Sequence, residues 1–264
     1  MKLLIIGAGR MSEAIISGLV QQGRIKAKDI IVSNQKSMDR LQALQQTYHV
    51  TVTPEWPSYV HQVDAVLLAA PPHAHDTLLA ELSHSVSQPF IMTVAAGIDP
   101  TYMEERLPQG TPVAWIMPNT AAQVQRSLST YTLGRYVTEK DKQTLHMILE
   151  AIGQAVLLSE QQVHDMTAIT GSAPAFLYLF CEALEKAAQS YGVSPEQART
   201  LVTNMISGSA AMLEAGYDPG DLREQVTTPG GSTAAGLDIL HQHRFEALLK
   251  EAVKATNAHA RGEQ

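Results

Sequence analysis

The fold is decided near the start of the chain, by the stretch KLLIIGAGRMS at residues 2–12. An apolar run at residues 2–6 leads directly into Gly7, Ala8 and Gly9, and apolar residues then recur at helical spacing. A continuous apolar run indicates a strand covered on both faces, and the glycines indicate a tight turn into a helix. The order strand, glycine turn, helix is typical of a doubly wound α/β domain that binds a dinucleotide.

The glycine turn fits the pattern G-x-G-x-x-S, in which each small residue has a separate role. Gly7 allows a sharp turn, Gly9 lets the backbone approach a pyrophosphate, and Ser12 allows close packing of helix on strand. The helix N-terminus would present free N–H groups and a partial positive charge to the phosphates. The alternative is a tight strand–helix turn that binds no ligand.

The end of the second predicted strand bears on the choice of cofactor. An acidic residue there would bind the 2′-hydroxyl of the adenine ribose in NAD. This chain instead has Ser33 and Asn34, followed by the cation Lys36. We therefore predict NADPH, with NADH also possible; the alternative is a solvated polar loop.

Outward from this stretch, short apolar runs alternate with helical patterns, which predicts a mostly parallel sheet between helices over residues 1–159. Strands are expected at residues 2–6, 30–32, 50–53, 65–70, 90–95, 113–117, 129–133 and 155–158. Helical patterns take over afterwards, at residues 174–191, 194–215 and 244–257, with further helix starts at Asp218 and Ser232. Residues 160–264 are thus predicted to form an all-helical domain. It is short for a core of its own, so we expect it to pack against a second copy of the chain.

The composition excludes several classes of function. The net charge of −7 and the lack of basic runs argue against nucleic acid as a partner. A single cysteine cannot form an internal disulfide or a cysteine-based metal site, and the ten histidines show no strong ligand spacing, so no metal is predicted. No uninterrupted apolar stretch is long enough to predict a membrane span, and a cytoplasmic location is expected.

Two further segments have the composition of binding loops. Met117-Pro118-Asn119-Thr120 follows a predicted strand, on the edge where such sheets bind ligands. Residues 227–233, TTPGGST, lead into a predicted helix and could offer free N–H groups to a small carboxylate. For this second segment, a simple helix start after a flexible turn remains the alternative.

Together these motifs resemble pyrroline-5-carboxylate reductase over nearly the full chain. The N-terminal part of the resemblance comprises G-x-G-x-M-x-x-A-I at residues 7–15, Ala95-Ala96-Gly97 and the segment at residues 117–120. The more specific part is C-terminal, in TGSAPAF at residues 170–176, GSAAMLE at 208–214 and VTTPGGST at 226–233.

The resemblance implies reduction of L-1-pyrroline-5-carboxylate, a small imine carboxylate, to L-proline with hydride from NAD(P)H. It implies that Thr233 hydrogen-bonds the ring nitrogen and is the catalytic residue. It implies a homodimer, with larger assemblies of dimers possible. The substrate residues implied by the resemblance are Glu160, Val226, Thr228, Gly230, Gly231, Ser232 and Thr233. The predicted cofactor residues are Ile6, Gly7, Ala8, Gly9, Arg10, Met11, Ser33, Asn34, Ala69, Ala70, Pro71, Ala95, Ala96 and Asn119.

The chain departs from the usual family pattern at several positions. Arg10 replaces an asparagine, Ala70-Pro71-Pro72 stands where the family has V-K-P, and Ala173 replaces a glycine. Residues 121 and 122, both alanine, follow Thr120 where proline and alanine are usual. These departures leave two alternatives: a paralogue that reduces another small imine or acid, and a non-catalytic regulatory protein that binds NADP.

Overall fold

The computed structural model describes residues 1–85 and 89–261. The chain forms two compact units: unit 1 comprises Met1–Ser172 together with the chain from residue 257 onward, and unit 2 is Ala173–Thr256. The domain boundary expected at residues 159 and 160 stays a prediction, and the last three residues of the expected second domain lie outside the described residues.

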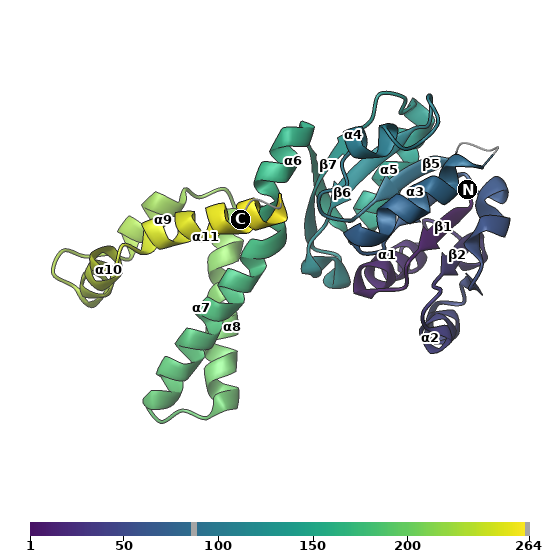
Figure 1. Ribbon diagram of the computed structural model, residues 1–264. Coiled ribbons are helices and arrows are strands. Elements are labelled where there is room, and N and C mark those ends of the chain that lie inside the picture. The colour runs from purple at the N-terminus through teal and green to yellow at the C-terminus, as the bar shows by residue number, and fades with distance from the viewer. Residues whose placement is uncertain (86–88, 262–264) are drawn as a thin grey trace. The chain divides into compact units, whose positions relative to one another are not determined.

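Unit 1 is built on an eight-stranded sheet, in the order β3-β2-β1-β4-β5-β6-β7-β8. Figure 1 shows this sheet, with β1, β2, β5, β6 and β7 labelled. Each strand pairs in parallel with its neighbours except at β6 and β7, which are antiparallel. The mostly parallel, doubly wound sheet predicted from the apolar runs is thus confirmed. The strands are β1 (Leu3–Ile6), β2 (Ile30–Ser33), β3 (Thr51–Thr53), β4 (Ala65–Leu68), β5 (Phe90–Thr93), β6 (Val113–Met117), β7 (Ser127–Leu133) and β8 (Gly153–Leu157).

Helices cover both faces of this sheet. Alternate side chains of β1 point to opposite faces, so Leu3 and Ile5 join one buried cluster and Leu4 and Ile6 join the other. The first cluster includes α1, α2 and α5; the second includes the 3₁₀ segment η2, α3, α4 and α6. The helices are α1 (Arg10–Gln21), α2 (Met38–Tyr48), α3 (His75–Ser83), α4 (Pro100–Glu104), α5 (Glu139–Ile152) and α6 (Glu160–Thr167). The shorter segments are η1 (Ala27–Asp29), η2 (Trp56–Gln62), η3 (Pro72–Ala74), η4 (Thr120–Val124) and the π-turn η5 (Ala168–Ser172).

Unit 2 is helical, as predicted. Its helices are α7 (Ala173–Ser190), α8 (Pro195–Glu214), α9 (Pro219–Gln225), α10 (Ser232–Gln242) and α11 (Phe245–Ala260), whose last turn belongs to unit 1. The predicted start of α8 is confirmed in detail, because Ser194 and Gln197 form a reciprocal capping box. Gly192 and Gly216 adopt positive φ just after α7 and α8, the conformation that favours glycine after a helix.

Unit 2 buries very little of its own apolar surface. Among its residues, Ala198 and Val202 are buried, whereas many large apolar side chains are exposed. The exposed set includes Leu177, Tyr178, Leu179, Phe180, Leu201, Met205, Met212, Leu213, Ile239, Leu240, Phe245, Leu248 and Leu249. Exposed apolar surface on this scale marks an interaction surface.

One helical stretch within the described residues, Glu160–Ser190, is long and apolar enough to cross a membrane, judged by length and composition only. A helix that packs its apolar side chains against protein passes the same test, so this stretch is weak evidence for a membrane span.

The contact between α1 and α5 predicts a sensitive glycine. A Cβ added at Gly18 would lie 2.0 Å from the carbonyl oxygen of Ala151, which belongs to the backbone of α5. We expect Gly18→Ala to lower the free energy of unfolding by about 1–3 kcal/mol, because the two helices must move apart. Urea denaturation measures this, with the neighbouring Ser17→Ala as the control that leaves the contact intact. Equal stability of the two variants would contradict the prediction.

Candidate functional site

Unit 1 contains a cavity of about 700 Å³ at the carboxyl ends of its parallel strands. It lies where the strand order reverses, between β1 and β4, which is the ligand-binding position of doubly wound sheets. Of the fourteen predicted cofactor residues, all but Arg10 and Asn119 line this cavity: Ile6, Gly7, Ala8, Gly9, Met11, Ser33, Asn34, Ala69, Ala70, Pro71, Ala95 and Ala96. The structure thus brings together most of the residues chosen from sequence, and their role in binding stays a prediction.

The glycine turn at residues 7–9 forms one side of the cavity largely from backbone atoms. Gly7 has a φ of 113°, and a Cβ there would lie 2.5 Å from the carbonyl oxygen of Ala69. A Cβ at Gly9 would instead meet no protein atom within 4 Å. Gly9 caps α1 without a side-chain hydrogen bond, and Ser12 donates its hydroxyl to the carbonyl of Gly7 at 2.7 Å. The arrangement leaves the first amides of α1 available to an anionic group.

The end of β2 offers polar groups to the same cavity. The Ser33 hydroxyl is buried and has no hydrogen-bond partner among the described residues, so a bound molecule could satisfy it. Asn34 accepts a hydrogen bond from the amide of Lys36 at 3.3 Å, and both residues line the cavity. A hydroxyl, an amide and a cation together fit a phosphorylated ribose.

Arg40 was not identified from sequence. Its guanidinium donates to the carbonyl of Ala8 at 2.9 Å and forms an ion pair with Glu13 of α1. Arg40 therefore supports the glycine turn from behind, on the first turn of α2. A cation a few residues past the second strand is the only sequence signal for it, and that signal does not distinguish a supporting role from a solvated one.

Arg10 and Asn119 lie outside the lining of this cavity. Arg10 lines a separate, smaller cavity with Glu13 and Tyr48. Asn119 uses both ends of its amide within the protein: it accepts from the amide of Ala121 at 3.0 Å and donates to the carbonyl of Thr170 at 3.0 Å. The structure therefore gives Asn119 a supporting role at the π-turn η5, and its predicted contact with a cofactor stays a prediction.

The predicted carboxylate segment lies in unit 2, ahead of α10. Thr228 and Gly231 close a turn through a hydrogen bond of 2.9 Å, with Gly230 at a φ of 73° in the position that favours glycine. The Gly231 amide is used in this turn, so the amides offered by the first turn of α10 are those of Ser232 and Thr233. Gly231 caps α10 without a side-chain hydrogen bond. The geometry is that of an anion-binding helix start.

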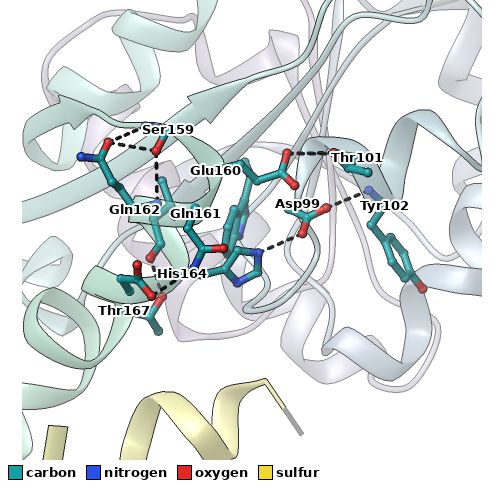
Figure 2. A network of polar contacts seen from close by, with 12 residues as sticks. Asp99, Thr101, Tyr102, Ser159, Glu160, Gln161, Gln162, His164 and Thr167 are labelled. Atoms are coloured by element: carbon teal, nitrogen blue, oxygen red, sulfur yellow. Dashed lines mark hydrogen bonds and ion pairs between the residues drawn. The ribbon is translucent and has the colours of Figure 1, made fainter. Parts of the chain in front are cut away.

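Glu160 belongs to a polar network in unit 1 (Figure 2). Its Oε2 accepts from both the amide and the hydroxyl of Thr101, at 3.3 and 3.1 Å. Asp99 caps α4 and contacts Nε2 of His164 at 2.9 Å. The ring of His164 lies 4.6 Å from that of Trp115, between centroids. Burial, and secondly the charge of Asp99, raise the pKa of Glu160.

Sequence reasoning missed Asp99 and His164, which lie 65 positions apart along the chain. Together with Glu160 they bring three ligand-type atoms within 4.8 Å of one another, a grouping that could hold a metal ion. Each of the three side chains already has a hydrogen-bond partner in the protein. The expectation that the chain binds no metal stays a prediction.

The raised pKa of Glu160 leads to a test of this network. Asp99→Asn keeps an oxygen that caps α4 and turns an amide N–H donor towards Nε2 of His164 in place of the second carboxylate oxygen. It removes the neighbouring charge, so the pKa of Glu160 should fall towards its ordinary value. Carboxyl ¹³C shifts followed through a pH titration would show the lower midpoint. Because folding raises this pKa, the stability contributed by Glu160 is present at low pH and is lost as the pH rises through the folded value. An unchanged Glu160 midpoint would show that Asp99 does not influence it.

Two family models match the chain. Residues 160–263 match the model described as pyrroline-5-carboxylate reductase dimerisation, and residues 2–97 match that of NADP oxidoreductase, coenzyme F420-dependent.

Relatives match nearly the full length. Pyrroline-5-carboxylate reductase 2 of Bacillus subtilis is 32% identical over 97% of this chain and 92% of its own length. The structure of 1-pyrroline-5-carboxylate reductase from Streptococcus pyogenes is 30% identical with a TM-score of 0.90, covering 99% of this chain and 98% of that one. A pyrroline carboxylate reductase from Plasmodium falciparum, solved with NADP bound, is 25% identical with a TM-score of 0.90, covering 100% of this chain and 98% of that one.

Proposed function

The chain belongs to the pyrroline-5-carboxylate reductase family, and we propose that it reduces L-1-pyrroline-5-carboxylate to L-proline with hydride from NADPH. The observation that carries this proposal is the likeness over 97% of the chain, which spans both the glycine-lined cavity of unit 1 and the turn before α10 in unit 2. The product places the enzyme at the last step of proline synthesis. We propose that it acts in the cytoplasm.

We propose that the unit 1 cavity binds NADPH. Bound there, the nucleotide would supply the hydride. The open backbone at Gly9 and the first amides of α1 would receive the pyrophosphate. Ser33, Asn34 and Lys36 would receive the 2′-phosphate, because they offer hydrogen bonds and a positive charge without a carboxylate to repel it. NADH would bind less tightly, since it lacks the group that these residues recognise.

We propose that the start of α10 binds the substrate. The amides of Ser232 and Thr233 would hold the carboxylate, with the turn at Thr228 and Gly230 setting their direction. The Thr233 hydroxyl would hydrogen-bond the ring nitrogen and fix the orientation of the C=N bond. A protonated imine is already electrophilic, so positioning and charge neutralisation supply most of what the reaction needs. We also propose that the substrate contacts Val226, which is exposed, together with Glu160 and Gly231.

We propose that the enzyme is a homodimer through unit 2, and that dimers can assemble further. The scarcity of buried residues in this unit and its exposed apolar side chains support a partner of the same kind. The match of residues 160–263 to a dimerisation model supports the same conclusion. In this arrangement the apolar surface of α7 packs against protein rather than lipid.

Oxidation of NADPH by the purified protein, followed at 340 nm with and without pyrroline-5-carboxylate, tests the function. We expect turnover that depends on the imine, and we expect Thr233→Ala to lower kcat about 10²-fold or more with little change in NADPH affinity. Thr200→Ala, at an exposed position on α8, is the control. Turnover with other imines only would identify a paralogue of different specificity, and NADPH binding without turnover would identify a regulatory protein.

The two glycines of the turn are expected to respond differently to alanine. Gly9→Ala should fold normally but bind NADPH at least about tenfold more weakly, because its methyl group would occupy space meant for the pyrophosphate. Gly7→Ala should lose stability, since its Cβ would meet the backbone of Ala69. Thermal denaturation and NADPH fluorescence titrations separate the two effects. Undiminished NADPH affinity in Gly9→Ala would rule out this binding position.

A further inference from the structure

A histidine lies fully buried behind the wall of the cofactor cavity. His75 is the first residue of α3 and has no exposed surface. Its Nδ1 lies 3.1 Å from the carbonyl oxygen of Pro71, and its Nε2 lies 2.8 Å from the hydroxyl of Thr93. Both ring nitrogens are therefore used, although the side chain does not line the cavity.

The partners of His75 constrain its tautomer. The Pro71 carbonyl can only accept, so Nδ1 carries a hydrogen. The Thr93 hydroxyl lies 2.8 Å from Nε2 and 3.3 Å from the carbonyl oxygen of Leu68, and it donates to the nearer Nε2 when the imidazole is neutral. The same hydroxyl oxygen accepts from the amide of Ala95 at 3.1 Å. A continuous chain of hydrogen bonds thus runs from the Ala95 amide through Thr93 and His75 to Pro71. Burial lowers the pKa of His75, which favours this neutral form.

Each end of the hydrogen-bond chain lies in a segment that lines the cavity. Pro71 follows β4 and Ala95 follows β5, and both residues are lining residues. The carbonyl of Ala95 also accepts from the indole N–H of Trp115 at 2.8 Å. Both the amide and the carbonyl of Ala95 are therefore held by side chains. These hydrogen bonds therefore connect two neighbouring walls of the cavity, residues 69–72 and 94–96, from the protein side.

We propose that His75 is a positioning residue for the cofactor, which holds these two walls in the arrangement that receives the nucleotide. An apolar side chain could fill the same volume without the desolvation cost of two buried ring nitrogens, so the imidazole is explained by its bonds rather than by packing. Walls fixed before binding lose less conformational entropy when the ligand arrives. The proposal rests on the proposed function, because it needs the cavity to bind NADPH.

Binding of NADPH to the full-length protein, measured by fluorescence titration, tests this role. His75→Leu removes both bonds and Thr93→Val removes the hydroxyl alone; each should raise the Kd for NADPH about five- to tenfold, the worth of one or two neutral hydrogen bonds. The kcat at saturating NADPH should stay within about twofold. His75→Asn retains a donor for Pro71 and should give an intermediate Kd, while Thr93→Ser should restore the wild-type value. Because His75→Leu and Thr93→Val break the same chain, the double variant should bind NADPH no more weakly than the worse single variant.

Controls distinguish positioning from general stability. Leu79→Ala removes a buried side chain from the same helix without touching the hydrogen-bond chain, and His84→Leu changes an exposed histidine at the end of that helix. Both should leave the Kd unchanged at temperatures where they are folded. The proposal is overturned if His75→Leu and Thr93→Val bind NADPH like the wild type, or if Leu79→Ala weakens binding equally. A wild-type protein that fails to bind NADPH would instead refute the proposed function.

Discussion

The close approach of the Gly7 backbone to the carbonyl of Ala69 is the constraint on which the rest of unit 1 depends. The amide of Gly7 donates to the carbonyl of Ser33, and the amide of Ala69 donates to that of Ile6. The ends of β1, β2 and β4 are thereby joined by backbone alone, with no side chain between them. This lets α1 begin directly beside the point where the strand order reverses, and the cavity opens there because no Cβ fills it.

Features that depend on local sequence could be predicted. Continuous apolar runs identified the strands, and serine caps identified the start of α8, because periodicity and capping act between neighbouring residues. The lining of the unit 1 cavity was largely predictable for a related reason: parallel strands end at one edge of the sheet, so the residues just after them meet there. The antiparallel pairing of β7 with β6 had no such local signal.

Features that depend on distant partners could not be predicted. The link between His75 and Thr93 joins the first residue of α3 to the last residue of β5, 18 positions away. Nothing near His75 in sequence indicates that it is buried. Asn119 was chosen for the cofactor from its place after β6, yet its amide serves the π-turn 51 positions later. The Thr170 carbonyl lies in this π-turn, and the amide of Asn119 is its donor from outside the turn. The roles of the residues before α10 follow from family resemblance alone, because their partner would be a ligand.

The reversal at β7 has a consequence for the route of the chain. Because β7 opposes β6 and β8 is parallel to β7, β8 runs away from the edge that carries the cavity, and α6 must travel back across the sheet. The helix therefore delivers Thr170 beside Asn119, at the edge where β6 ends. One inverted strand thus decides that the polypeptide leaves unit 1 at the edge of the sheet that carries the cavity. An uninverted β7 would have placed this exit, at Ser172, at the opposite edge.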